Sequence, residues 1–267
     1  MSKIGFIGMG NMGYAMLSGC LKQFQAEEIL FTDVNTERMS NVTLSTKVRH
    51  VDSNAELANN VKYIVLAIKP QYFSAVLKNI ENVVTKDHVI ISIAPGISRE
   101  DIKDSLGYDA RVVRAMPNTP ALLGEGMTGV CYDSTLFTYE EKEVIASIFK
   151  SFGKFRIIEE RLMSAVTCAS GSSPAYVYMF IEAMADGVVK HGLPRDVAYE
   201  MVAQTVAGAA KMVLETGKHP GELKDMVCSP GGTTIAGVAA LEEEGFRNSI
   251  IKACDACYEI SEGFKRK

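Results

Sequence analysis

The sequence lacks the features that mark membrane, secreted and nucleic-acid-binding proteins. No stretch approaches roughly 18 consecutive apolar residues, the length that a membrane-spanning helix needs. The apolar run at residues 4–7 is too short for the hydrophobic part of a signal peptide. Neither sign of charge dominates, because 28 Lys and Arg face 32 Asp and Glu, a net charge of −4. We therefore expect a cytoplasmic protein whose partner is a small molecule and not a membrane or a nucleic acid.

Cysteine is present, but not in the arrangement of a metal or redox centre. The six cysteines are scattered, and only Cys254 and Cys257 form a C-x-x-C pair. A tetrahedral zinc site built from such a pair needs a second one, which the sequence does not contain. The segment around the pair has a helical pattern, where cysteine packs as a small apolar residue. We expect no bound metal.

The first part of the chain has the pattern of an α/β domain. Hydrophobic residues make up 47% of the 267 residues, enough for a sizeable core. Up to residue 160, short apolar runs alternate with helical patterns, which is typical of βαβ units around a mostly parallel sheet. The predicted strands are 4–7, 29–32, 63–68, 88–94, 111–116, 127–132 and 155–158, and the helical stretches include 12–24, 54–60, 72–82 and 139–152.

The second part of the chain has helical patterns and no convincing strand. Helical periodicity runs through residues 175–190, 195–216 and 247–264. We predict domains at residues 1–160 and 161–267, the second of them all-helical. Within residues 201–214 only Gln204, Thr205 and Lys211 are clearly polar, and a helix that is apolar nearly all round must be buried on every side. A second subunit is expected to bury it in a homodimer. Packing against the chain's own α/β domain is the alternative.

A glycine-rich segment after the first predicted strand has the spacing of a dinucleotide-binding loop. In Gly8-x-Gly10-x-x-Gly13, the first glycine permits a tight turn, the second lets a pyrophosphate approach the backbone, and the third allows close helix packing. The start of the following helix faces the phosphates. We expect the whole loop to contact the cofactor, including the intervening Met9, Asn11 and Met12.

The residues after the second predicted strand leave the choice between NAD and NADP open. Asp33 can accept hydrogen bonds from a ribose 2′-OH and would repel a 2′-phosphate. Asn35 and Arg38 follow closely, and an arginine can pair with that phosphate. These residues alone allow either cofactor.

Further loops follow predicted strands and are expected at the same edge of the sheet. Ligands of such sheets bind beyond the carboxyl ends of the strands. We therefore expect these loops to line the cofactor crevice. The residues concerned are Ala67, Lys69 and Pro70 at the end of the strand 63–68, Ala94 and Pro95 at the end of the strand 88–94, and Asn118 after the strand 111–116.

A late segment, Ser229-Pro-Gly-Gly-Thr-Thr234, precedes the apolar run 235–241, where a helix is expected to begin. Its glycines, Gly231 and Gly232, expose backbone N–H groups, and Thr233 and Thr234 offer hydroxyls. The start of a helix can hold an anion. The sequence therefore predicts a second anion-binding site, far from the glycine-rich loop.

Together these segments resemble the pyrroline-5-carboxylate reductase family. The matching segments are 8–13, 67–70, 116–120, 171–176 and, most specifically, 229–234. The resemblance implies an N-terminal Rossmann-like nucleotide-binding domain followed by an all-α dimerisation domain. It also implies reduction of 1-pyrroline-5-carboxylate to L-proline, the last step of proline synthesis. The family forms homodimers by exchange of helices, with an active site that includes helices of the partner, and dimers can assemble further.

The resemblance also implies roles for individual residues. The substrate carboxylate is expected on the N–H groups of Gly231, Gly232 and Thr233, beside Ser229, with Thr234 near the ring nitrogen. Because a threonine hydroxyl is a poor acid, we favour positioning or relay of a proton from water over direct acid catalysis by Thr234.

The family more often prefers NADPH, so NADPH is favoured and NADH remains possible. The resemblance places Asn54 beside the cofactor ribose. Ser173 departs from the glycine that similar proteins commonly have at this position.

Rival interpretations fit the residues less well. His191 and His219 flank helix ends, and Glu222 and Asp225 have the pattern of first-turn helix acids, so each has a structural role without catalysis. A hydroxyacid dehydrogenase would place a catalytic lysine on the first helix of the second domain, and residues 166–178 contain none. A scaffold without catalysis has no need of a carboxylate-binding turn.

Overall fold

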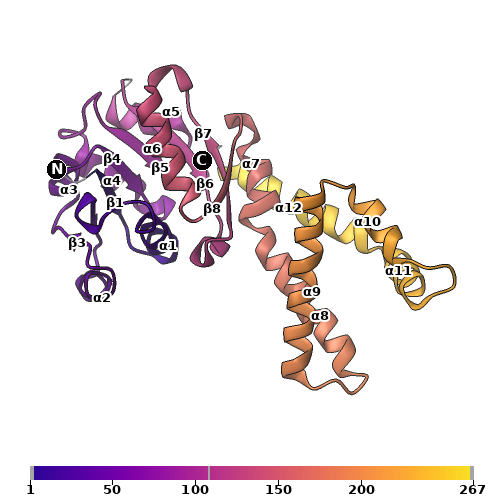
Figure 1. Cartoon of the computed structure of the whole chain (residues 1–267). Helices are drawn as coiled ribbons and strands as arrows, with labels where there is room; N and C mark the ends of the chain where they lie inside the picture. The colour runs from indigo at the N-terminus through magenta and orange to yellow at the C-terminus, as the bar shows by residue number, and fades with distance from the viewer. Residues whose placement is uncertain (1–2, 108, 265–267) are drawn as a thin grey trace. The chain divides into compact units, whose positions relative to one another are not determined.

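The computed structural model describes residues 3–107 and 109–264, which divide into two compact units (Figure 1). The first unit consists of two segments, one that ends at Ser172 and one that begins at Cys257. The second unit is Ser173–Ala256. This division differs from the predicted domains 1–160 and 161–267, because the residues just after 160 pack against the sheet. A Cβ built on Gly129 would lie 2.5 Å from Cγ1 of Val166, so the two residues are in direct contact.

The first unit is built on an eight-stranded sheet in the order β3-β2-β1-β4-β5-β6-β7-β8. Neighbouring strands are parallel except β6 and β7, which are antiparallel. Each predicted strand is present, but β3 has only two residues and was not predicted. The strands are β1 (Ile4–Ile7), β2 (Ile29–Thr32), β3 (Arg49–His50), β4 (Tyr63–Leu66), β5 (Val89–Ser92), β6 (Arg111–Met116), β7 (Gly126–Cys131) and β8 (Gly153–Ile157).

Helices cover both faces of this sheet, and each face has its own apolar core (Figure 1). Alternate side chains of a strand point to opposite faces, so Phe6 joins one core and Ile7 the other. The central strands are therefore apolar at nearly every position. The core that contains Phe6 is closed by α1 (Asn11–Cys20), α2 (Thr36–Thr46) and α6 (Tyr139–Lys150), and the other by α3 (Asn54–Asn60), α4 (Phe73–Ile80) and α5 (Arg99–Leu106). This arrangement confirms the predicted α/β fold class.

A short helical segment follows the sheet within the first unit. Helix α7 (Met163–Val166) continues into a π-helical turn, Thr167–Gly171. Such turns are rare and occur frequently at functional sites. A Cβ on Gly171 would lie 2.6 Å from Cε of Met116, so this turn packs directly against the end of β6.

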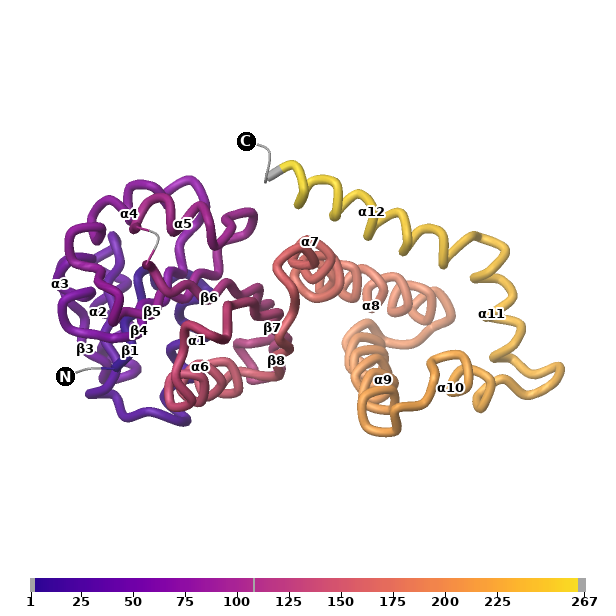
Figure 2. Tube along the Cα trace, turned by 90° about the horizontal axis from the view of Figure 1, so that it is seen from above, coloured from indigo at the N-terminus to yellow at the C-terminus, as the bar shows by residue number. Residues whose placement is uncertain are grey.

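The second unit consists of helices. These are α8 (Ser173–Val189), α9 (Arg195–Thr216), α10 (Pro220–Val227), α11 (Thr233–Glu243) and the first part of α12 (Phe246–Phe264). Helices α8 and α9 lie side by side (Figure 2). Of the hydrophobic side chains in residues 173–256, all of which the structure describes, only those of Ala185, Ala198 and Val202 are buried. No helix in the described part of the chain is both long and apolar enough to cross a membrane.

A partly buried cluster of charges lies at the edge of the sheet where β4 and β6 begin, and it joins Lys62 just before β4 to β6 and α6. The carboxylate of Glu141, only 4% exposed, accepts hydrogen bonds from Arg111 at 2.8 Å and forms an ion pair with Lys62 at 2.7 Å. Burial alone would raise the pKa of Glu141, but hydrogen bonds from Lys62 and Arg111 outweigh it and lower the pKa to about 2. The cluster stabilises the fold and lies away from the carboxyl ends of the parallel strands.

Replacing Glu141 by glutamine is expected to destabilise the protein at neutral pH by about 3 kcal/mol, the free energy that corresponds to this pKa shift. A lowered pKa in the folded state means that the stabilisation is present above the unfolded-state value of 4.5 and is lost as the pH falls toward 2. Urea unfolding from pH 7 down to pH 2 measures the effect. The matched control is Glu140→Gln at the exposed neighbouring position. A difference between Glu141→Gln and the parent that stays constant across this pH range would contradict the assignment.

Candidate functional site

The three glycines at the end of β1 and the start of α1 differ in what surrounds them. Gly8 has a φ of +97°, and a Cβ there would lie 2.5 Å from the carbonyl oxygen of Ala67. A Cβ on Gly13 would lie 2.2 Å from the carbonyl oxygen of Gly8. Gly10 is different, because its φ of −62° suits any residue and its Cβ would meet nothing within 4 Å. The fold thus requires Gly8 and Gly13, whereas the space at Gly10 is open to a ligand.

A cavity of about 430 Å³ lies beside Gly10, at the carboxyl ends of β1, β4, β5 and β6. This is the edge at which open α/β sheets bind ligands. The cavity brings together several of the predicted cofactor residues. Its lining includes Gly10, Asn11, Met12, Ala67, Lys69, Pro70 and Pro95, together with Met116 and Pro117.

Helix α1 begins at this cavity with its first N–H groups uncapped by any side chain. Gly10 is the N-cap residue, and it supplies no side-chain hydrogen bond. The N–H groups of a helix's first turn have no acceptor within the helix and favour an anion. Met9 and Ala94 were also predicted to contact the cofactor, but they do not line the cavity. The side chain of each is buried in one of the two apolar cores. The side chain of Met9 is therefore not available to a ligand.

Asp33 and Arg38 both bind the backbone of Met9. The Asp33 carboxylate accepts a hydrogen bond from the Met9 N–H at 2.5 Å and one from the Asn35 N–H at 2.9 Å. The Arg38 Nε–H donates to the Met9 carbonyl. The Asn35 side chain caps α2 by accepting from the Arg38 N–H at 2.9 Å. The sequence did not predict that these residues hold the glycine-rich loop.

Asn54 is the first residue of α3 and is partly buried, while Ser53 before it caps the helix. The loop that carries both residues follows β3, which is parallel to β2. Asn54 therefore lies at the same edge of the sheet as the cofactor loops. Its predicted contact with the ribose stays a prediction.

The amide of Asn118 makes two hydrogen bonds within the protein. Its Oδ1 accepts from the Met127 N–H at 2.8 Å, and its Nδ2 donates to the Ser170 carbonyl at 3.0 Å. The side chain is buried, and it joins the loop after β6 to β7 and to the π-helical turn. Asn118 therefore holds the cavity wall formed by Met116 and Pro117 in place.

Replacing Asn118 by alanine is expected to lower the free energy of unfolding by about 3 kcal/mol, because a buried N–H and a buried carbonyl lose their partner. Thermal or urea unfolding measures this. Asn82→Ala at an exposed position is the control and should change stability by less than about 0.5 kcal/mol. If both variants unfold at the parent's midpoint, the two hydrogen bonds of Asn118 do not contribute.

The segment 229–234 forms a turn that ends at the start of α11. Gly231 has a φ of +67°, and α11 begins at Thr233 with Gly232 as an N-cap that makes no side-chain hydrogen bond. The first N–H groups of α11, those of Thr233 and Thr234, therefore have no intrahelical acceptor. Ser229 is exposed, and Thr234 is partly buried. The turn has the donors that a carboxylate requires.

Gly232 has a different role from the one predicted. Its N–H donates to the Ser229 carbonyl at 3.1 Å, so this group closes the turn instead of facing outward. A Cβ on Gly232 would lie 2.4 Å from Oγ of Ser229, so a side chain there would require this hydroxyl to move. The outward donors of the turn are therefore carried by the residues after Gly232.

The polar residues near α10 have structural partners. His219 caps the helix, since its Nδ1 accepts from the Gly221 N–H at 3.0 Å. Glu222 lies in the first turn as predicted and pairs with Lys218 at 2.6 Å. Asp225 does not lie in the first turn, because α10 begins at Pro220 and ends at Val227. That prediction was wrong by about one turn of the helix.

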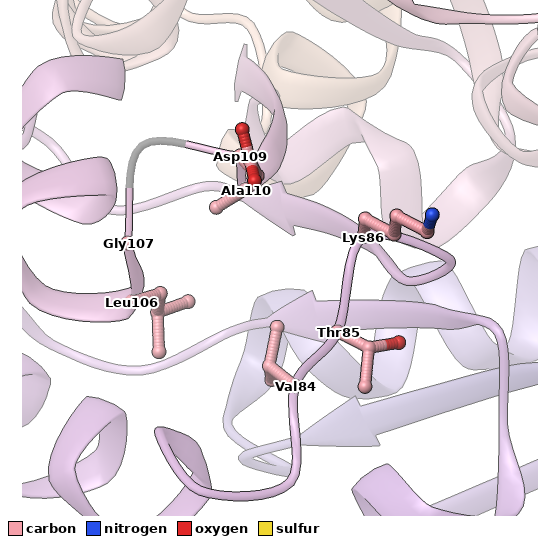
Figure 3. A pocket seen from close by; sticks show the side chains of 7 residues that line it. All are labelled: Val84, Thr85, Lys86, Leu106, Gly107, Asp109 and Ala110. Atoms are coloured by element: carbon pink, nitrogen blue, oxygen red, sulfur yellow. The ribbon is translucent and has the colours of Figure 1, made fainter.

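Another cavity, of about 360 Å³, lies at the opposite edge of the sheet (Figure 3). It is lined by residues that precede β5 and β6, among them Val84, Thr85, Lys86, Leu106 and Asp109. The amino ends of parallel strands are not where such sheets bind ligands. The cavity beside Gly10 is therefore the better candidate for ligand binding.

Comparison with known families matches two models. Residues 3–96 match the family described as NADP oxidoreductase coenzyme F420-dependent, and residues 160–264 match that described as pyrroline-5-carboxylate reductase dimerisation. The first match contains the glycine-rich loop, and the second contains the turn at 229–234.

Individual proteins match over nearly the whole chain. The pyrroline-5-carboxylate reductase of Escherichia coli (strain K12) is 46% identical, with 97% of each chain covered, and that of Methanosarcina acetivorans is 42% identical, again with 97% of each covered.

Solved structures match equally completely. The pyrroline carboxylate reductase of Plasmodium falciparum, solved with NADP bound, is 33% identical with a TM-score of 0.89, covering 99% of this chain and 98% of that one. The enzyme from Coxiella burnetii is 31% identical with a TM-score of 0.92, covering 100% and 99%.

Proposed function

The chain belongs to the pyrroline-5-carboxylate reductase family, and we infer from this that it reduces 1-pyrroline-5-carboxylate to L-proline with NADPH, the last step of proline synthesis. The observation that carries the inference is that the similarity runs through both units. One chain therefore has both the dinucleotide loop and the anion-binding turn.

The residues around the cavity at Gly10 suit a dinucleotide. The open space at Gly10 and the uncapped start of α1 suit the pyrophosphate, and the loops after β4 and β5 supply Lys69, Pro70 and Pro95. When bound, the reduced nicotinamide supplies a hydride to the imine carbon. The protein itself contributes binding and orientation.

The turn at 229–234 is proposed to bind the carboxylate of the substrate. The N–H groups of Thr233 and Thr234 at the start of α11, together with that of Gly231, are donors of the right kind. Ser229 adds a hydroxyl. Binding the carboxylate at a defined place orients the ring and its C=N bond.

Thr234 is proposed to hydrogen-bond to the ring nitrogen. Reduction adds a hydride to the imine carbon and requires one proton on the nitrogen. Because the threonine hydroxyl is a poor acid near neutral pH, its role is to position the nitrogen or to relay a proton from water.

We also propose that the helical unit forms the homodimer. Its apolar side chains are largely exposed in a single chain, for example Met179 at 68% and Leu214 at 66%. An apolar groove of about 450 Å³ runs between α8 and α12, lined by residues that include Tyr176, Met179, Phe180, Leu241, Phe246 and Ile250. Exposed apolar surface of this kind marks a protein interface.

Two finer points stay predictions. Assembly of the dimers into larger oligomers would be detected by light scattering coupled to size-exclusion chromatography. A cytoplasmic location would be tested by fractionation of cells.

The decisive experiment measures cofactor oxidation with 1-pyrroline-5-carboxylate as substrate, at saturating NADPH and separately at saturating NADH. A parallel assay uses an oxo acid that a hydroxyacid dehydrogenase would reduce. We expect the cofactor to be oxidised with the cyclic imine and not with the oxo acid. The reaction with the imine should be more efficient with NADPH than with NADH. Oxidation with the oxo acid alone, or with neither compound, would refute the proposed function.

A further inference from the structure

We propose that Arg38 selects NADPH over NADH, and that Asp33 is a positioning residue of the glycine-rich loop that does not discriminate between the two cofactors. This inference rests on the proposed function, since it concerns the cofactor of that reaction. The sequence alone gives conflicting signals here, because an acid at the end of β2 is typical of NAD-binding proteins and a nearby arginine is typical of NADP-binding proteins.

The contacts of Asp33 give its carboxylate a role within the protein, because one acceptor site on each oxygen is already used. Both of its carboxylate oxygens accept hydrogen bonds from the protein, one from the Met9 N–H and the other from the Asn35 N–H. These bonds direct the carboxylate toward the loop that carries Gly8 and Gly10. Asp33 therefore fixes the position of Met9, the residue between the two glycines.

Arg38 offsets the negative charge of Asp33. Its Nε–H donates to the carbonyl of Met9, the same residue whose N–H binds Asp33. The two opposite charges therefore bind the same residue of the loop, and their net charge is zero. A 2′-phosphate that approaches these two side chains therefore meets no net negative charge from them.

The rest of the guanidinium is available to a phosphate. Within residues 3–107 and 109–264, the structure records no partner for its two terminal nitrogens. Arg38 also lines an open hollow of about 460 Å³ between α1 and α2, together with Tyr14, Asn35, Glu37, Asn41 and Ser45. Arginine pairs with phosphate through two parallel N–H groups. The Nε of Arg38 thus binds the Met9 carbonyl, and its two terminal nitrogens remain for a phosphate.

Direct binding of oxidised cofactors tests the proposal without any turnover. Calorimetry measures the dissociation constants of NADP⁺ and NAD⁺ for the parent and for Asp33→Asn and Arg38→Gln. We expect Arg38→Gln, which keeps an N–H donor for Met9 but removes the charge, to weaken NADP⁺ roughly ten- to hundredfold and NAD⁺ less than about threefold. Asp33→Asn leaves either the Met9 or the Asn35 N–H without an acceptor and places an amide beside it, and it is expected to weaken the binding of both cofactors by a similar factor of roughly ten.

A second measurement separates positioning from a loss of folding. Hydrogen exchange of residues 8–13 without cofactor should become faster in Asp33→Asn and stay close to the parent in Lys78→Ala, which removes an exposed positive charge on α4. Lys78→Ala should also leave both dissociation constants unchanged.

Two results would overturn the inference. One is tighter binding of NADP⁺ by Asp33→Asn together with weaker binding of NAD⁺. This result would mean that Asp33 binds the ribose 2′-hydroxyl and repels the 2′-phosphate. The other is an equal loss of both cofactors in Arg38→Gln. Failure of the imine assay would refute the proposed function but would leave these binding results to decide the cofactor selectivity.

Discussion

Replacing Gly10 by valine is expected to weaken NADPH binding more than about a hundredfold while the protein stays folded. The φ of −62° at Gly10 is compatible with valine, and a Cβ there meets no protein atom within 4 Å. The added side chain instead occupies the space that a pyrophosphate needs in order to reach the first N–H groups of α1. Calorimetric titration with NADPH measures the loss.

Stability measurements distinguish this result from simple misfolding. Gly10→Val should cost about 1 kcal/mol, because valine is a poor N-cap residue. Gly13→Ala is the contrasting variant, since its Cβ would lie 2.2 Å from the Gly8 carbonyl oxygen and must displace the loop or the helix. We expect Gly13→Ala to lower the urea midpoint much further than Gly10→Val. Normal NADPH affinity in a folded Gly10→Val protein would show that the cofactor binds elsewhere.

Replacing Thr234 by alanine is expected to lower the rate of hydride transfer about a hundredfold, in the range that loss of one well-placed hydrogen-bonding group produces. NADPH affinity should change by no more than a few fold, because the dinucleotide loop belongs to the other unit of the chain. Stopped-flow measurement of NADPH oxidation in a single turnover observes the chemical step directly. Alanine suits the second position of α11, so the helix should form normally.

Thr234→Ser is the matched control for this prediction. Serine keeps the hydroxyl and removes only a methyl group, so the single-turnover rate should stay within several fold of the parent. An alanine variant that transfers hydride at the parent's rate would remove Thr234 from the mechanism. The carboxylate-binding role of the turn would then need a separate test, through the KM for the imine.

Much of the fold can be predicted from local patterns. The apolar runs at β1, β2 and β6 are found with their predicted bounds, and α9 begins and ends where its periodicity does. These elements are long or strongly apolar, so the local signal is unambiguous. Strand β3 was missed because two residues, Arg49 and His50, carry no periodicity. The π-helical turn Thr167–Gly171 was missed because its pattern is that of an ordinary helix.

The sequence predicted which segments contribute to the candidate site, but not which of their polar groups bind the protein's own backbone. The glycine-rich loop and the segment 229–234 were both recognised from residue types and spacing. Asn118, Asp33 and Gly232 were assigned to ligands, whereas the structure gives each of them hydrogen-bond partners within the protein. One partner of Asn118 lies 52 residues away and one partner of Asp33 lies 24 residues away, too far for a local pattern to reveal.

The sequence by itself determined the order of strands and helices, the family, and which segments carry donors for anions. These properties depend on residue type and on spacing over a few positions. Only the tertiary structure decided which polar groups bind the protein's own backbone and which remain for a ligand. Asp33 and Arg38 meet at Met9 because β1 and β2 pair in the sheet, and such a contact exists only when strands distant in sequence lie side by side.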